Sequence, residues 1–207
     1  MYRRDGLAAL AAALALLAIS PAHAEADPAV AAEFVRQTGR DMAGVVGDAS
    51  TPIEKKKRLQ PFLDRVADVD GVARFCLGRF WRVATPEQQQ EYLRLFHAIL
   101  LNGIVGRMTD YRPGTTMKVN VGQPVRHEDG VYVPTTVERE GNPTVRVQWV
   151  VNLEGPQPKL VDVIAEGMSL RLTQRSDYVA FINRNGGSVE ALIKALQQQA
   201  AQNAGPS

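Results

Sequence analysis

The amino-acid sequence comprises 207 residues with a formal net charge of +2, and 45% of the residues are hydrophobic. Once an N-terminal export signal is set aside, this length suits one compact domain, with or without a helical extension. The balanced charge argues against a protein that covers the phosphate backbone of a nucleic acid.

Residues 1–24 have the features of a secretory signal peptide. Arg3 and Arg4 form a positive start, residues 7–19 are apolar, and Ala22-His23-Ala24 provides the small residues that a signal peptidase recognises. The apolar stretch is shorter than the about 20 residues that span a bilayer, so a cleaved signal is favoured over an uncleaved anchor. The general secretory route is favoured over twin-arginine export. Because the signal carries Arg3, Arg4 and Asp5, we expect a mature chain with a net charge of +1.

Three helices are predicted before residue 80. Asp27-Pro28 gives the first helix an N-cap and a proline in its first turn, and Gly47 and Ser50 end it. Thr51-Pro52-Ile53-Glu54 is a capping box that opens the second helix, in which Pro61 predicts a kink or a break. The third helix is short, from Asp70 to Leu77, and closes near Gly78.

A second capping box, Thr85-Pro86-Glu87-Gln88, opens the longest helix, which we expect to reach about Tyr111. An apolar face this wide predicts contact on more than one side. Periodicity alone favours a central core helix over a helix that faces a ligand cavity. One apolar stripe consists of Leu93, Phe96, Leu100, Ile104 and Met108, and a second of Leu95, Ile99, Leu101 and Val105.

Beyond Pro113-Gly114 the apolar period changes from helical to two. Alternation over residues 117–121, 131–137, 145–153 and 161–165 predicts short strands joined by turns such as His127-Glu128-Asp129-Gly130. Pro134 suggests an edge strand or a bulge. The whole pattern is typical of an antiparallel meander with one buried face.

Two helices are predicted after the strands. Gly186-Gly187 stops the first, which Tyr178, Phe181 and Ile182 mark, and Ser188 caps the second. Residues 199–207 are expected to form a flexible polar tail. Helices, then an antiparallel sheet, then helices indicate an α+β fold, and we expect one domain over residues 25–198.

Several short segments together resemble the MlaC family of periplasmic phospholipid carriers. Each segment alone is unspecific, and their order and spacing carry the resemblance, which covers residues 30–196. Paralogues associated with hopanoid lipids have similar sequences. The segments are Asp70-Gly71-Val72-Ala73-Arg74-Phe75, Leu77-Gly78 with Trp81, Thr85-Pro86-Glu87-Gln88, Asp162-Val163, and Glu166-Gly167 with Ser169-Leu170.

The resemblance implies a curved antiparallel sheet in a nuclear-transport-factor-like cone, with a helical subdomain and lipid tails held between the two. It implies a periplasmic carrier that shuttles phospholipid between an inner-membrane transporter complex and an outer-membrane lipoprotein complex. It implies neither a cofactor nor an enzymatic activity.

An apolar slot can bind a lipid without any catalytic group, because burial of each CH₂ contributes about 0.8 kcal/mol. The same apolar residues would also build an ordinary core, and the sequence leaves these two alternatives open. The candidate lining residues are Phe75, Leu93, Phe96, Leu100 and Ile104 from helices, and Val147, Trp149 and Val163 from strands.

An enzyme is the alternative from another class, because cones of this architecture also host isomerases and dehydratases. Asp162, His97 and Tyr132 are the most plausible acid–base residues, although their pattern is not specific. A simpler interpretation is that Asp162 and Arg175 satisfy buried polar groups and tie a strand to a helix. A periplasmic adaptor with a solid core is a further alternative.

Metal and thiol chemistry are not indicated. Neither His97 nor His127 has ligand-like spacing to another histidine or to a cysteine, so we expect no metal site. Cys76 is the one cysteine and lies between Phe75 and Leu77, which favours a buried, inert thiol.

The longest basic run is Lys55-Lys56-Lys57-Arg58. The simplest interpretation is a solvated helix face. The alternative is a docking patch for anionic headgroups or for an acidic partner.

Overall fold

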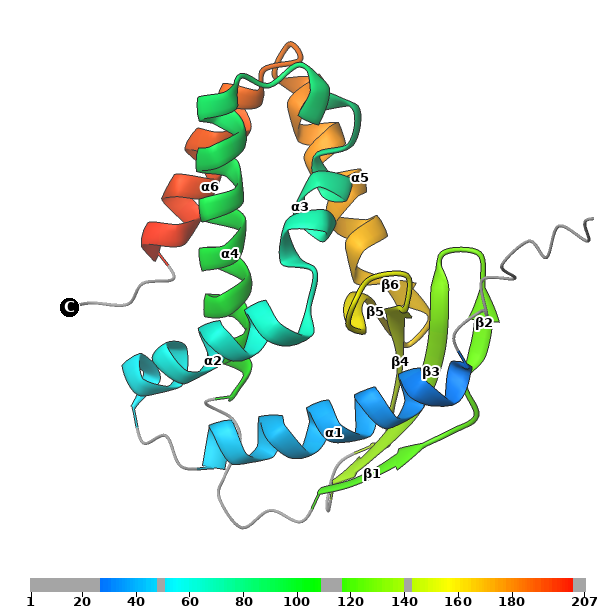
Figure 1. The fold of residues 1–207 in the computed structure, drawn as a ribbon. Coiled ribbons are helices and arrows are strands. Elements are labelled where there is room, and N and C mark those ends of the chain that lie inside the picture. Colours follow the sequence, from blue (N-terminus) through cyan, green and yellow to red (C-terminus); the bar gives the residue numbers. More distant parts are fainter. Residues whose placement is uncertain (1–26, 48–50, 109–116, 140–142, 203–207) are drawn as a thin grey trace, which may run out of the picture.

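A computed structural model describes residues 27–47, 51–108, 117–139 and 143–202 (Figure 1). Helices precede and follow a curved antiparallel sheet that does not close on itself, which confirms the predicted α+β class. The α-helices are α1 (Pro28–Gly47), α2 (Pro52–Val66), α3 (Val69–Leu77), α4 (Pro86–Met108), α5 (Leu170–Arg184) and α6 (Val189–Gln202), and a 3₁₀ helix, η1 (Gly78–Arg82), follows α3. The strands are β1 (Met117–Val121), β2 (Val125–His127), β3 (Gly130–Arg139), β4 (Val145–Asn152), β5 (Lys159–Ala165) and β6 (Met168–Ser169).

Local capping fixes the starts of several helices where the sequence predicts them. Thr51 and Glu54 form the predicted capping box of α2, with Glu54 N donating to Thr51 Oγ1 over 3.1 Å. Thr85 and Gln88 make the equivalent exchange at the start of α4. The third helix begins earlier than predicted, because the side chain of Asp68 caps it by accepting from Gly71 N. The predicted end of the long helix near Tyr111 lies outside the described residues.

Of the kink or break predicted at Pro61, the break is wrong, because α2 continues to Val66. Proline removes the hydrogen bond to the carbonyl four residues earlier, here that of Lys57. Both Pro61 and Lys57 are exposed, so water can solvate that carbonyl. The packing of Leu59, Phe62 and Val66 on the buried side then holds the helix together.

The sheet has the strand order β1-β3-β4-β5-β6, and β2 also pairs with β3. The short strands β2 and β6 were not predicted. Pro134 is not on an edge strand, because β3 has neighbours on both sides. It lies where the partner of β3 changes from β2 to β1, and its carbonyl accepts from Gly122 N. The N–H that proline lacks therefore falls at a gap in the ladder, where it is least needed.

The turn between β5 and β6 uses left-handed backbone. Glu166 and Gly167 have φ angles of 47° and 83°, a conformation that suits glycine and disfavours most side chains. After β6, Ser169 caps α5 by accepting from Leu172 N. The last helix, α6, continues to Gln202, into the segment expected to be a tail.

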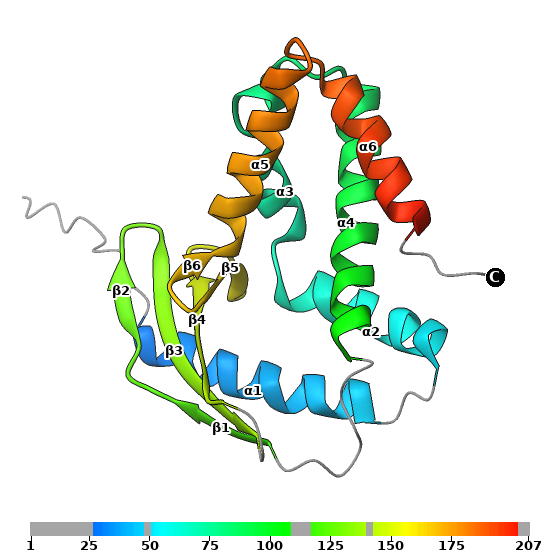
Figure 2. The ribbon, with the colours of Figure 1, turned by 180° about the vertical axis from the view of Figure 1, so that it is seen from behind.

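Three apolar clusters hold the described part of the chain together. The largest lies among α3, α4, α5 and α6, which stand together as one helical unit in Figures 1 and 2. A second joins α1 to the sheet, and a third joins α2 to the lower part of α4. Thus α1 and α2 connect the helical unit to the sheet.

Candidate functional site

One face of the sheet is covered by α1 at one end only. Ala31, Ala32 and Val35 of α1 pack on Val133 and its neighbours on this face, and all of these side chains are buried. Small alanine side chains allow the helix to approach the strands closely. The register shows which residues continue the same face, because directly opposite residues of paired strands point to the same side.

Away from α1 this face changes from buried to partly open. Trp149 lies opposite Val163, and Val147 opposite Ala165, and all four are half-buried. Further along, Val119 is 48% exposed and Val145 is 43% exposed. Side chains typical of a core therefore continue into a zone that no described element fully covers. We call the half-buried set Val147, Trp149, Val163 and Ala165 the open sheet face.

A hydrogen-bonded pair fixes the aromatic ring of the open sheet face. Trp149 Nε1 donates to Thr135 Oγ1 over 3.1 Å, and Thr135 Oγ1 donates to the Val147 carbonyl over 3.1 Å. Thr135 itself is only 4% exposed. The polar atom of the indole is thus satisfied within the sheet, which leaves the rest of the ring as apolar surface.

The helices add a second apolar wall. Phe34 of α1 packs against both the sheet cluster and the α2–α4 cluster, as does Leu160 of β5. In the α2–α4 cluster, Leu63, Leu101 and Ile104 are half-buried. These residues connect the apolar surface of the sheet to that of the helices.

A groove of about 410 Å³ lies between α2 and α4. Its apolar lining comes from Leu63, Val69, Leu100 and Leu101, and its polar lining from Gln60, Asp64, Arg94, His97 and Asn102. His97 Nε2 lies 2.8 Å from Asp70 Oδ1, and its Nδ1 lies 3.8 Å from Asp64 Oδ1. Arg94 is bound to Glu91 through two contacts of 2.7 Å. The two basic groups of the groove, His97 and Arg94, are thus already paired with carboxylates.

The structure distributes the eight predicted lining residues over several regions. Leu93, Phe96 and Leu100 pack in the helical cluster, as does Phe75, whose ring lies under the guanidinium groups of Arg171 and Arg175. Ile104 belongs to the α2–α4 cluster. Val147, Trp149 and Val163 lie together on the open sheet face. Phe96 is buried, and the other seven are half-buried, so their role as a lipid lining remains a prediction.

Sequence reasoning missed Phe34, Leu63 and Leu160 as members of this apolar surface. The helical spacing of Phe34 and Leu63 marks them as buried-side residues of their helices, but spacing does not reveal which surface they join. Leu160 lies beside a bulge in β5, where its register with β4 shifts, so strict alternation does not identify its face.

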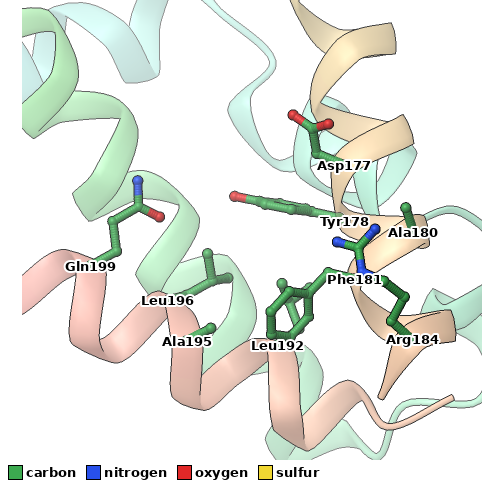
Figure 3. Close-up of a pocket in the computed structure, with 9 residues that line it drawn as sticks. All are labelled: Asp177, Tyr178, Ala180, Phe181, Arg184, Leu192, Ala195, Leu196 and Gln199. Carbon is green, nitrogen blue, oxygen red and sulfur yellow. The ribbon is translucent and has the colours of Figure 1, made fainter. Parts of the chain in front are cut away.

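A second hollow of about 300 Å³ lies between α5 and α6 (Figure 3). Tyr178 and Phe181 of α5 face Leu192 and Leu196 of α6, with Gln199 further along α6. Tyr178, Leu192 and Leu196 are core residues of the helical unit, and none of the eight predicted lining residues borders this hollow. It is therefore separate from the apolar surface described above.

Asp162 holds the sheet to α5, as its predicted structural role requires. Its carboxylate is buried and accepts hydrogen bonds from Val163 N, Ser169 Oγ and Arg171 N over 2.7, 2.5 and 3.0 Å. The arginine beside it is Arg171, whose Nε lies 3.4 Å away, and not the predicted Arg175. Arg175 instead lies over Phe75. Arg171 and Arg175 are one helical turn apart, and the approach of α5 to β5 brings the earlier one to the carboxylate.

Of the three residues of the enzyme alternative, His97 lies apart, whereas Tyr132 and Asp162 are linked through Asp129 and Arg171. His97 contacts Asp64 and Asp70 between helices, Asp162 binds the start of α5, and the Tyr132 hydroxyl donates to Asp129 over 3.2 Å. Burial and the bond to Asp129 raise the pKa of Tyr132 above its ordinary value. Burial raises the pKa of the Cys76 thiol from 9.0 to about 12, so the thiol is protonated at neutral pH.

The described residues contain neither a cluster of metal ligands nor a membrane-spanning helix. No group of three histidine, cysteine, aspartate or glutamate side chains is placed to hold a metal ion. Among the helices of the described ranges, none combines the length and apolarity needed to cross a membrane.

The fold and the partly open apolar surface define a helix-and-sheet protein with room for an apolar ligand, and comparison with known proteins gives its family. Residues 41–198 match the family model described as MlaC protein. The chain therefore belongs to the MlaC family, which confirms the resemblance seen in the sequence.

Individual relatives agree with this family. The chain is 26% identical over 155 residues to the toluene tolerance protein Ttg2D of Pseudomonas putida, an alignment that covers 70% of each chain. Its fold is similar to that of a phospholipid-binding protein from Ralstonia solanacearum solved in complex with a phospholipid. That likeness has a TM-score of 0.74 at 23% identity and covers 84% of this chain and 98% of the other.

Proposed function

We propose that this protein is a periplasmic phospholipid carrier that holds acyl chains against the open sheet face and the adjoining helices. The observation that carries the proposal is the half-buried apolar set Val147, Trp149, Val163 and Ala165, which continues a packed core outward. Membership of the MlaC family and the phospholipid bound to the Ralstonia relative support the choice of ligand.

The tails supply most of the affinity. Each CH₂ group removed from water contributes about 0.8 kcal/mol, so one long acyl chain is enough for tight retention. Among the described residues, the arginine that borders the α2–α4 groove is already bound to Glu91. The headgroup therefore stays near water, and the carrier responds to chain length more than to headgroup charge.

The protein carries its ligand and does not convert it. An acid–base mechanism requires a proton donor or acceptor within reach of one reacting centre. Asp162 is engaged by three donors, and His97 by carboxylates in another part of the molecule. These contacts favour structural roles for both residues over the isomerase or dehydratase alternative.

The predicted signal peptide supports a periplasmic location for the mature chain, in the aqueous gap between two membranes. A carrier there exchanges lipid with an inner-membrane transporter complex and an outer-membrane lipoprotein complex, the partners that the family implies. Export is checked by N-terminal sequencing of the chain from a periplasmic fraction, which should begin after Ala24.

Native mass spectrometry of the gently purified protein tests the central proposal. We expect a bound mass that matches a diacyl phospholipid at about one lipid for each chain, released by organic extraction. Exchange should then depend on acyl-chain length at a fixed headgroup more strongly than on the headgroup at fixed chain length. Lipid-free protein from several gentle preparations would contradict the proposal.

A further inference from the structure

The first two turns of α2 carry an exposed patch that the proposed cargo site does not use. Ile53, Lys56 and Lys57 are spaced at i, i+3 and i+4, so they share one face of the helix. Ile53 is 78% exposed, more than any of the other exposed large apolar side chains in the described residues. Lys55 and Arg58 flank these residues. We call Ile53, Lys56 and Lys57 the α2 basic patch.

The lysines of this patch differ from the lysines outside α2. Lys118 and Lys194 form ion pairs with Glu138 and Glu190, and Lys159 donates to the carbonyls of Asp64 and Arg65. Within the ranges that the structure describes, Lys56 and Lys57 have neither an ion pair nor a hydrogen bond. Their ammonium groups therefore remain available to an external anion.

Helix stability does not account for these cations. The helix dipole stabilises cations at the C-terminal end of a helix, whereas Lys56 and Lys57 lie near the N-terminal end of α2. The nearest acid, Glu54, accepts from Thr51 in the capping box. That box fixes the first turn, so the patch sits on a rigid base.

The position of the patch suits contact with a large flat surface. Figures 1 and 2 both show the first turns of α2 at an outer corner of the molecule, on the side away from the sheet. Further along α2, Gln60 and Asp64 continue the face of the patch and, with Leu63, line the α2–α4 groove. Contact through the patch would therefore bring the groove close to the surface that is bound.

We propose that the α2 basic patch docks the protein on the surface of an anionic phospholipid bilayer. The lysines bind at the level of the lipid phosphates, and the Ile53 side chain enters the boundary between headgroups and acyl chains. An acidic protein would bind the lysines equally well, but its carboxylates would provide no apolar contact for the exposed Ile53 side chain. The combination of cations with an apolar tip favours the bilayer.

Flotation of the purified protein with two kinds of vesicle tests this proposal. One kind contains phosphatidylcholine alone, and the other also contains phosphatidylglycerol. We expect binding to the anionic vesicles only, and weaker binding as salt shortens the range of the attraction. Lys56→Ser with Lys57→Ser should weaken binding roughly 30-fold, because each lysine near an anionic surface contributes on the order of 1 kcal/mol.

A matched control removes two other exposed positive charges. Lys118→Ser with Lys194→Ser has the same net charge as the patch variant. It should retain most of the vesicle binding, because both side chains lie outside α2 and already have partners. Ile53→Ser should weaken binding roughly tenfold without changing its salt dependence, because it removes apolar contact only. All variants change exposed or half-exposed positions, so their melting temperatures should match that of the wild type.

Three outcomes would overturn the proposal. They are equal binding to both kinds of vesicle, an equal loss in the patch variant and the control variant, and no binding of the wild type to either kind. The last outcome would favour an acidic protein as the partner of the patch. The phospholipid content of each purified variant is measured in parallel. Unchanged content shows that cargo binding is intact, so failure of docking and failure of the carrier function are distinguishable.

Discussion

The indole N–H of Trp149 donates to the hydroxyl of Thr135 across the β3–β4 pair, and the same hydroxyl donates to the carbonyl of Val147. This diagonal contact satisfies the polar atom of the ring within the sheet. The remaining ring surface is half-buried at the end of a packed core. Trp149 is therefore placed to report on whatever covers the open sheet face.

Fluorescence of Trp149 should respond to the lipid. In a Trp81→Phe background, removal of the lipid should move the emission to longer wavelength, because water then contacts the indole. The reciprocal variant, Trp149→Phe, retains Trp81, which packs against the helical cluster, and its emission should change little. Equal responses from the two tryptophans would contradict the placement of lipid on the sheet.

A tryptophan substitution should reduce the amount of bound lipid on the open sheet face but not on the other face of the sheet. Val147→Trp fills space on the open sheet face and should lower the amount of bound phospholipid at least severalfold. Val125→Trp is the control, because Val125 is 53% exposed and pairs with Tyr132 on the other face. Leu100→Trp should act like Val147→Trp if the groove holds part of the lipid. Mass spectrometry of extracted lipid measures the amount bound to each of the three variants. Full lipid occupancy in Val147→Trp would count against this binding surface.

Removal of the Asp162 carboxylate should strongly destabilise the fold. Asp162→Ala leaves Arg171, which is only 15% exposed, with the more exposed Asp129 as its remaining counter-charge, and it leaves two backbone N–H groups without an acceptor. Loss of one partner of a buried charge pair costs about 3–5 kcal/mol. Glu138→Ala breaks an exposed pair with Lys118 and should cost no more than about 1 kcal/mol. Urea unfolding of the two variants gives this comparison, and similar midpoints would refute the structural role of Asp162.

The buried thiol should make stability fall at high pH. Burial raises the pKa of Cys76 from 9.0 to about 12, so the unfolded chain loses this proton before the folded chain does. The contribution is fully present below about pH 9 and decreases between pH 9 and pH 12, by about 1.4 kcal/mol for each pH unit. Between pH 8 and pH 10 the free energy of unfolding should therefore fall less for Cys76→Ala than for the wild type.

A labelling experiment checks the same property independently. A thiol reagent at pH 8 should label Cys76 slowly in the folded protein and rapidly in urea, because the thiolate is the reactive form. Rapid labelling without denaturant would show that the side chain is not buried as described.

The sequence was most informative where structure is local. The capping boxes at Thr51 and Thr85 consist of bonds between residues three apart, so their pattern is visible along the chain. The period-two alternation likewise predicted β1, β3, β4 and β5. The strands β2 and β6 span only three and two residues, which is too short for a period to be recognised.

Features that depend on distant partners could not be predicted. Pro134 was predicted to mark an edge strand or a bulge because proline cannot donate to a ladder, but the change of partner from β2 to β1 is a property of the whole sheet. Likewise, the sequence could not decide whether Arg171 or Arg175 would meet Asp162. The eight candidate lining residues are all apolar, as both a core and a ligand surface require. Only the packing of α1 over one end of the sheet distinguishes covered positions from open ones.

The shortness of β6 has a consequence for the behaviour of the protein at high concentration. An edge strand with a long row of free backbone groups is a template on which another chain can add a strand. Here the described sheet ends in a strand of two residues, directly followed by a capped helix. At the other edge, β1 alternates its valines with Lys118 and Asn120. Both edges therefore resist growth into cross-β fibrils.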